Sequence, residues 1–144
     1  MAAEACQVDF YLLASASLDA SHLACKLALM AWERGHSIDI MTANRAEAAA
    51  LDELMWAYPE GRFLPHERAT GDSVSRAPIR IHELPPAGRA DVIINLTSEP
   101  LEAPGRCTRL LEIVPYRPAE REASREKFRA YRDQGLEPAT HEIS

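Results

Sequence analysis

The sequence predicts an α/β fold in which a parallel β-sheet is covered by helices. Two observations support this: short apolar runs alternate with stretches of helical periodicity, and the connections between them are short. An order of strand, helix, strand and helix is typical of a parallel sheet. The chain has 144 residues, of which 47% are apolar and 26% charged, as expected for a globular domain with its own core.

The first strand is expected at residues 8–13 (VDFYLL), a run rich in strand-forming residues. Asp19 or Ser21 can cap the helix that follows, and its apolar periodicity extends to about Arg34. Gly35 stands where the glycine that ends a helix is usually found. These residues predict one strand–helix unit.

A second unit repeats this order. Residues 37–41 (SIDIM) are expected to form a strand, and Asn44 can cap a helix over residues 46–57 (AEAAALDELMWA). This helix should end before Pro59, because proline disrupts a helix interior.

Three further strands are expected in the second half of the chain. The stretch 57–78 before them is interrupted by prolines and glycines and is expected to be irregular. The three strands are expected at 78–82 (PIRIH), 91–96 (DVIINL) and 109–114 (RLLEIV).

A last helix is expected to begin at Pro118, which suits a first turn, and to extend to about Asp133 before Gly135. Residues 136–144 are polar and are expected to form a mobile tail. Because the sequence contains no linker or internal repeat, residues 1–144 are expected to form a single domain.

A strand–helix opening suggests, as one alternative, a nucleotide-dependent α/β enzyme. The first junction reads LLASASLDASH, and no glycine precedes Gly35. The dinucleotide fingerprint and the P-loop both need glycines there, because the phosphate must approach the backbone closely. We therefore expect a Rossmann-like topology without a nucleotide-binding loop, and no cofactor.

Residues suited to catalysis or metal binding are sparse. Ser15 and Ser17 follow the first strand, but no G-x-S-x-G turn surrounds them. The three cysteines lack a C-x-x-C spacing and the five histidines stand singly, which argues against a metal site and a disulfide framework. The sequence therefore predicts no catalytic and no metal-binding residue.

The same features bear on location. The N-terminus lacks the cationic segment of a signal peptide, and no apolar run approaches the roughly 20 residues of a membrane span. We expect a cytoplasmic protein without a membrane partner.

The charge is unevenly distributed along the sequence. The net charge is −6, which argues against a direct DNA-binding module, because such modules need many cations to neutralise phosphates. Residues 115–132 nevertheless carry six cations and three carboxylates, a net +3 that leaves −9 for the remainder.

Within this basic segment, Arg121, Arg125, Phe128 and Arg132 fall at helical spacings that share one face. Two arginines four residues apart repel each other, and an anionic ligand would relieve the repulsion. Arginine beside an aromatic ring suits a peptide with an apolar anchor and a carboxylate, such as the C-terminus of another protein. The alternative is that the cations stabilise the helix dipole and pair with nearby Glu, while Phe128 belongs to the core.

Aromatic residues gather in residues 54–69 (LMWAYPEGRFLPHERA), where a helix end leads into an irregular segment. Trp56, Tyr58 and Phe63 there could anchor a partner protein. Alternatively, they could hold the loop onto the protein's own core.

These segments carry a resemblance to a known family. The FYLL strand, LDELMWAYPEGRFLPH, DVIINL and VPYRPAEREASREKFRAYRDQGL resemble, in order over residues 8–136, the chi subunit family of the bacterial DNA polymerase III holoenzyme. The resemblance implies a three-layer fold with helices on both faces of a mostly parallel sheet. It implies a non-catalytic accessory subunit of a DNA-directed DNA polymerase, which is a nucleotidyltransferase.

The resemblance also implies partners. In that family, the psi subunit tethers chi to the clamp loader. The acidic C-terminal tail of the single-stranded DNA-binding protein, which ends in Phe, binds chi and so links the replisome to coated lagging-strand DNA. Trp56 and Phe63 match positions associated with psi and, in competition, with a repair helicase.

By position, Val114 and Phe128 would form the pocket for the terminal Phe ring of that tail. Arg121 and Arg125 would meet its carboxylate and the preceding acidic residues. Family members have Lys where Arg121 stands, which keeps the charge, and Tyr where Phe128 stands, so a hydrogen bond from that hydroxyl is not expected here.

Overall fold

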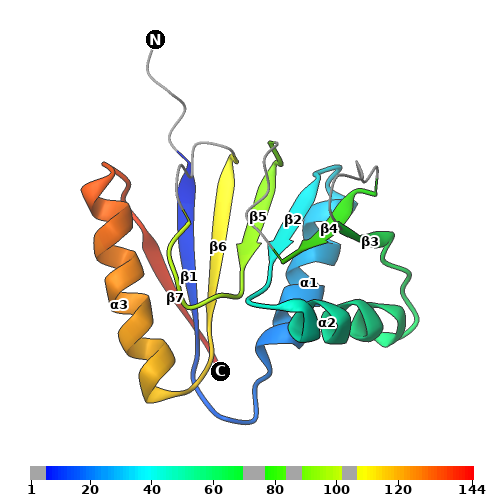
Figure 1. Cartoon of the computed structure of the whole chain (residues 1–144), viewed down its shortest axis with the longest axis horizontal. Coiled ribbons are helices and arrows are strands. Elements are labelled where there is room, and N and C mark those ends of the chain that lie inside the picture. Colours follow the sequence, from blue (N-terminus) through cyan, green and yellow to red (C-terminus); the bar gives the residue numbers. More distant parts are fainter. Residues whose placement is uncertain (1–5, 70–76, 84–88, 102–106) are drawn as a thin grey trace.

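A computed structural model describes residues 6–69, 77–83, 89–101 and 107–144. Its described strands form one parallel sheet in the order β3-β4-β2-β5-β6-β1-β7 (Figure 1). β1 lies between β6 and β7, and β2 lies between β4 and β5. The strands are β1 Gln7–Leu13, β2 Ile38–Met41, β3 His66–Ala69, β4 Ile79–His82, β5 Val92–Asn95, β6 Arg109–Val114 and β7 Ala139–Ile143.

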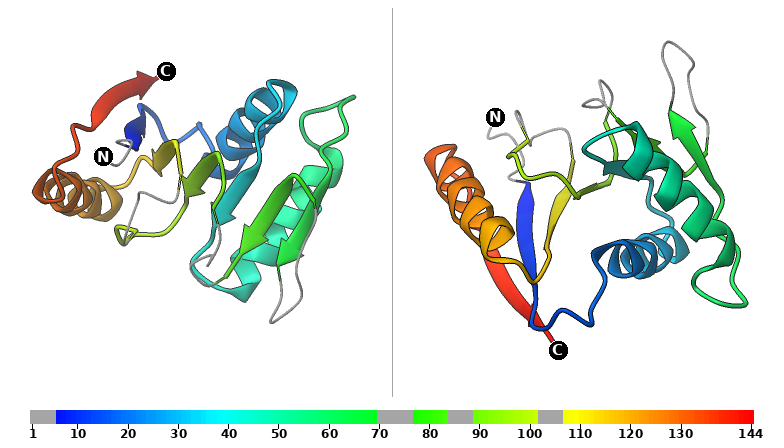
Figure 2. Two further views of the ribbon diagram at one scale, coloured as in Figure 1. Left: turned by 90° about the horizontal axis from the view of Figure 1, so that it is seen from above. Right: turned by 60° about the horizontal axis from the view of Figure 1, so that its bottom comes forward.

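Helices cover both faces of the sheet, as expected. α1 (Ala20–Glu33) and α2 (Arg45–Ala57) pack on one face, and α3 (Pro118–Asp133) packs on the other (Figure 2). No helix in the described part of the protein is long and apolar enough to cross a bilayer.

Each face buries its own apolar cluster. The larger one joins α1 and α2 to residues such as Ile40 of β2 and Ile81 of β4. The smaller one lies under α3 and includes Val8, Phe10 and Tyr131. Successive strand residues point to opposite faces, so β5 and β6 contribute apolar residues to both clusters, as is usual for strands covered on both faces of a parallel sheet.

The helix boundaries match the expected signals. The Asp19 side chain accepts hydrogen bonds from the amides of Ser21 and His22 in the first turn of α1, and Asn44 accepts one from the amide of Glu47 in α2. Gly35 and Gly135 follow α1 and α3 with φ of 86° and 85°, a conformation that glycine adopts without steric cost.

Two strands lie where irregular structure was expected. Residues 66–69 form β3 within the stretch expected to be irregular, and residues 139–143 form β7 within the segment expected to be a mobile tail. Both predictions were wrong for the same reason. β3 and β7 are the edge strands of the sheet, and an edge strand can remain polar because much of its surface faces water.

Candidate functional site

Helix α3 is held to the sheet by a buried polar cluster. Lys127 Nζ lies 2.8 Å from Glu112 Oε1 on β6 and donates to the carbonyl oxygen of Thr97 at 2.7 Å. The Tyr131 hydroxyl and the Asn95 amide both donate to Glu112 Oε2. Lys127 and Glu112 are almost completely buried, so these contacts replace the water that both charges lose.

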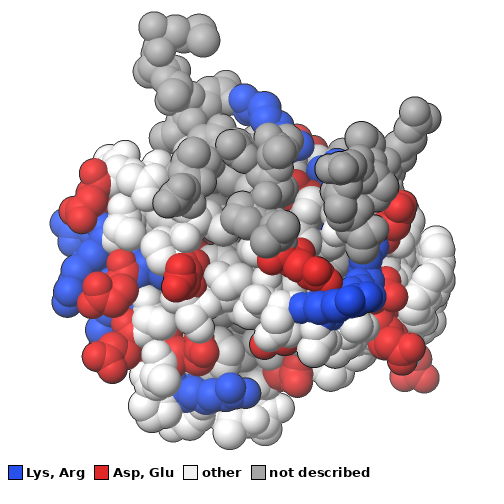
Figure 3. Space-filling view, viewed as in Figure 1, with Lys and Arg blue, Asp and Glu red and all other residues white. Residues whose placement is uncertain are grey.

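Burial raises the pKa of the Glu112 carboxyl above its ordinary value, while Lys127, Tyr131 and Asn95 act in the opposite direction. Lys127 is therefore an interior residue, although it is one of the six cations in the basic segment of residues 115–132. The exposed charge of α3 comes from its arginines, which gather with several carboxylates over this helix (Figure 3).

This packing leaves one flank of α3 beside a cavity of about 220 Å³, which we name the α3–β7 cavity. It opens between α3 and the end of the sheet formed by β1 and β7. Three of the four residues expected to bind a peptide line it. The lining residues are Phe10, Leu12, Arg121, Ser124, Arg125, Phe128 and Thr140.

Val114, the fourth residue expected there, does not line the cavity. It is 2% exposed and belongs to the apolar cluster under α3. Val114 lies on β6 opposite Leu12 of β1, which places it one strand away from the opening.

Strand β1 supplies the wall instead. The Phe10 and Phe128 rings lie 5.5 Å apart with an interplanar angle of 44°, and Thr140 of β7 stands opposite Phe10. Sequence reasoning missed Phe10, Leu12 and Thr140 because only strand pairing brings β1 and β7 beside α3. The alternation of Phe10 and Leu12 along the first strand was the one available signal.

The two arginines of the cavity differ in how they are held. An Arg121 Nη atom donates to the carbonyl oxygen of Leu13 at 3.0 Å, and its guanidinium lies 5.3 Å from the centre of the Tyr116 ring. Arg125 is exposed and, among the described residues, makes no hydrogen bond or ion pair through its guanidinium. Arg121 is therefore oriented in advance, and Arg125 is available to an anion.

Trp56 and Phe63 form a second exposed feature, at the end of α2 and in the segment before β3. α2 and β3 lie at the opposite end of the sheet from α3 (Figure 1). Trp56 and Phe63 are 64% and 63% exposed, and their ring centres lie 6.1 Å apart. Trp56 also contacts the His66 ring edge-on at 4.7 Å. Leu64, which is fully buried, anchors this loop to the core, so the two exposed rings are not needed for that purpose.

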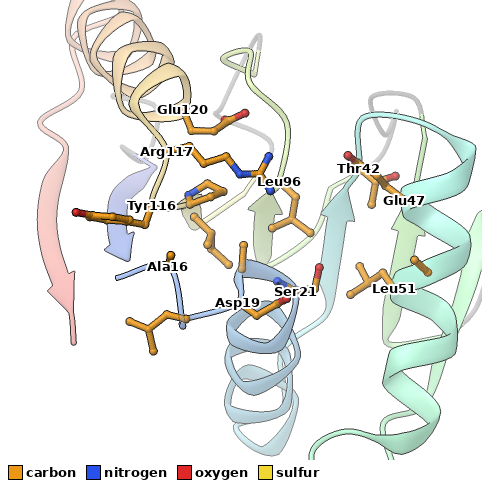
Figure 4. A pocket seen from close by; sticks show the side chains of 15 residues that line it. Ala16, Asp19, Ser21, Thr42, Glu47, Leu51, Leu96, Tyr116, Arg117 and Glu120 are labelled. Atoms are coloured by element: carbon orange, nitrogen blue, oxygen red, sulfur yellow. Dashed lines mark hydrogen bonds between the residues drawn. The ribbon is translucent and has the colours of Figure 1, made fainter. Parts of the chain in front are cut away.

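The carboxyl ends of the strands border another cavity of about 370 Å³, where α/β folds commonly bind ligands (Figure 4). Three carboxylates line it, those of Asp19, Glu47 and Glu120, against the single cation of Arg117. The Asp19 carboxylate already accepts hydrogen bonds from two amides in the first turn of α1. Amides at this end of a helix are the groups that would otherwise bind a phosphate. This lining is unsuited to a nucleotide.

Solved structures share the fold of this protein at low sequence identity. The C-terminal domain of the S. cerevisiae DEAD-box protein Dbp5 aligns with a TM-score of 0.67 at 12% identity, covering 96% of this chain and 90% of that one. T4 UvsW aligns with a TM-score of 0.67 at 9% identity, covering 97% of this chain and 42% of that one. At such identities the likeness describes architecture alone.

Proteins related in sequence identify the family of this chain. The chain is 38% identical to DNA polymerase III subunit chi of Pseudomonas aeruginosa, covering 95% of this chain and 96% of that protein. It is 29% identical to the Escherichia coli chi subunit, covering 79% of each. The family model for the DNA polymerase III chi subunit, HolC, matches residues 6–139. The chain therefore belongs to the family of DNA polymerase III chi subunits.

Proposed function

We propose that this chi subunit is a non-catalytic adaptor that binds the acidic C-terminal tail of the single-stranded DNA-binding protein in the α3–β7 cavity. The observation that carries the proposal is that one opening combines an apolar wall with Arg125, a cation that has no ion pair with any described residue. Phe10, Leu12 and Phe128 can enclose a terminal aromatic ring, and Arg125 can receive its carboxylate.

Charge supports the same ligand. Arg121 and Arg125 repel each other across one helical turn, and an acidic peptide lowers that cost. The acidic residues before the terminal ring would extend toward Arg121. Outside residues 115–132 the protein has a net charge of −9, which disfavours binding to bare DNA. An interface of this size should have a dissociation constant on the order of micromolar, which corresponds to a binding free energy of about −8 kcal/mol.

A second surface supports the other expected partner. Trp56 and Phe63 form an exposed aromatic pair at the opposite end of the sheet from the α3–β7 cavity. Exposed aromatic side chains of this kind commonly anchor protein interfaces. We assign this pair to the psi subunit of the clamp loader, and to a repair helicase in competition. Because the two surfaces are separate, both partners can bind one molecule together.

The test of the peptide site is a titration of the full-length protein with a labelled peptide that has an acidic run and a terminal Phe. Arg125→Ala should weaken binding more than tenfold, because it removes the cation available to the carboxylate. Removal of the terminal Phe from the peptide should have the same effect.

Arg129→Ala is the matched control. Arg129 is also an exposed arginine of α3, but it pairs with Glu126 and does not line the cavity. This variant should bind as the parent does. Equal loss in both variants would mean that only the overall charge of α3 matters and would refute the cavity assignment.

A further inference from the structure

Cys6 and Cys107 lie side by side although 101 positions separate them in the sequence. Their Sγ atoms are 3.1 Å apart, and both are thiols. The two residues are 4% and 3% exposed and belong to the apolar cluster under α3. Sequence spacing gave no sign of this pair, because only the pairing of β1 with β6 creates it.

The backbone holds the two sulfurs in this arrangement. Cys6 immediately precedes β1, and the amide of Gln7 donates to the carbonyl oxygen of Thr108 at 2.9 Å. Gln7 is also paired in register with Arg109 of β6. Each cysteine is therefore within two residues of a parallel strand pair, which keeps their relative position fixed.

We propose that Cys6 and Cys107 form a redox-active dithiol that a hydroperoxide such as hydrogen peroxide converts into an intramolecular disulfide. Disulfide sulfurs are roughly 2.0 Å apart, so the two Sγ atoms need to approach by about 1 Å. The proposal is independent of the peptide and psi surfaces assigned above.

The two thiols have different roles in this reaction. The hydrogen bond from Cys107 lowers the pKa of the Cys6 thiol, although burial and Asp9 oppose the change. The same hydrogen bond, together with burial, raises the pKa of Cys107. Cys6 is therefore the nucleophile and Cys107 the resolving thiol.

The reaction balances in two steps. The Cys6 thiolate attacks one oxygen of hydrogen peroxide, which breaks the O–O bond and gives Cys6 sulfenic acid and hydroxide. The hydroxide takes up the proton that the Cys6 thiol released and becomes water. The Cys107 sulfur then attacks the Cys6 sulfur and forms the S–S bond. The hydroxyl of the sulfenic acid leaves with the Cys107 proton as a second water.

Cys25 provides an internal control. It is also fully buried, but it lies on α1 in the cluster on the opposite face of the sheet. Burial, followed by the Asp19 charge, raises the pKa of its thiol to about 12. Cys25 should react with peroxide at least tenfold more slowly than the pair.

The experiment exposes the reduced full-length protein to hydrogen peroxide, alkylates remaining thiols after unfolding, and measures the intact mass and the linked peptides. The parent and Cys25→Ala should each lose about 2 Da through a bond between positions 6 and 107. Because this disulfide closes a long loop, the oxidised protein should also have a higher Tm that dithiothreitol reverses.

Cys107→Ser should form no disulfide and should leave a sulfenic acid at Cys6 that dimedone traps. Should this variant fail to fold, the linked peptides of the parent and of Cys25→Ala still decide the matter. The proposal is overturned if the parent keeps three alkylatable thiols, if its disulfide includes Cys25 or joins two molecules, or if Cys25 reacts as fast as Cys6.

Discussion

Lys127 of α3 and Glu112 of β6 form a buried ion pair, with 2.8 Å between Nζ and Oε1. Together with the buried Tyr131, which donates to the same carboxylate, the pair holds one face of α3 against the sheet. With Lys127 directed toward the sheet, Arg121, Arg125 and Phe128 lie on the flank that borders the α3–β7 cavity. A polar contact inside the protein thus helps to determine which residues of α3 reach the candidate peptide site.

Lys127→Met should lower the free energy of unfolding by about 3–5 kcal/mol, because it leaves the Glu112 carboxylate buried without its cation. Urea denaturation measures the effect. Glu112→Gln combined with Lys127→Met should recover part of the loss. Glu126→Ala, which breaks an exposed pair with Arg129 on the same helix, should cost less than about 1 kcal/mol. Similar losses from the buried and exposed pairs would contradict this account.

Peptide binding at the α3–β7 cavity should weaken as salt is added, because exposed charges are screened beyond about 10 Å at 0.1 M ionic strength. Fluorescence anisotropy of the labelled peptide across a salt series gives the slope. Arg125→Ala should reduce this slope, and Phe128→Ala should weaken binding at every salt concentration with the slope unchanged. A parent affinity independent of salt would exclude the charge contribution.

Trp56→Ala and Phe63→Ala should each change the free energy of unfolding by less than about 0.5 kcal/mol, because both side chains are largely exposed. Each should weaken binding of psi in a pull-down or titration. Met30→Ala is the control, since Met30 is a similarly exposed apolar residue on α1. Retained psi binding in both aromatic variants would remove this surface from the proposal.

The stability of the fold should fall on acidification through Asp9. Burial raises the pKa of this carboxyl, but hydrogen bonds from His141 and Arg109 outweigh it and hold the pKa below its ordinary value. An unfolded Asp titrates near pH 3.9, so below about pH 4 the unfolded protein binds more protons, which favours unfolding.

Asp9→Asn should therefore be less stable than the parent near neutral pH and should lose less stability between about pH 4 and pH 2. Urea denaturation at several pH values measures both slopes. Parallel curves for the parent and Asp9→Asn would show that Asp9 does not contribute to the acid sensitivity.

Truncation after Glu137 should lower the Tm and weaken binding of the acidic peptide. It removes β7, which pairs with β1 along Asp9–Leu13, and it removes Thr140 from the cavity. A scanning-calorimetry Tm equal to that of the full-length protein would instead support a mobile tail.

Most elements could be predicted from local signals. The local signals were apolar runs, Asp19 and Asn44 at helix starts, and Gly35 and Gly135 after helices. They predicted the three helices and five of the seven strands that the described residues form. β3 and β7 escaped prediction because their polar sequences, HERA and ATHEI, become strands only through pairing with an existing sheet edge.

The residues of the candidate site were likewise predictable only in part. Helical spacing alone placed Arg121, Arg125 and Phe128 on one face, and the structure puts all three at one cavity. Val114 was expected in its wall, but it lies on β6, one strand away, and Phe10, Leu12 and Thr140 line the cavity instead. The order of strands across the sheet decides this, and no local pattern encodes that order.

By itself, then, the sequence determined the α/β class and the basic face of the last helix. It also predicted that the first strand–helix junction, which has no glycine, is not a nucleotide-binding loop. Each of these features depends on residues that are near neighbours in the sequence. The tertiary structure decided that Lys127 is buried, that Phe10 lines the cavity and that Cys6 meets Cys107. Those contacts join residues that are distant in sequence, and only the pairing of strands and the packing of α3 bring them within reach.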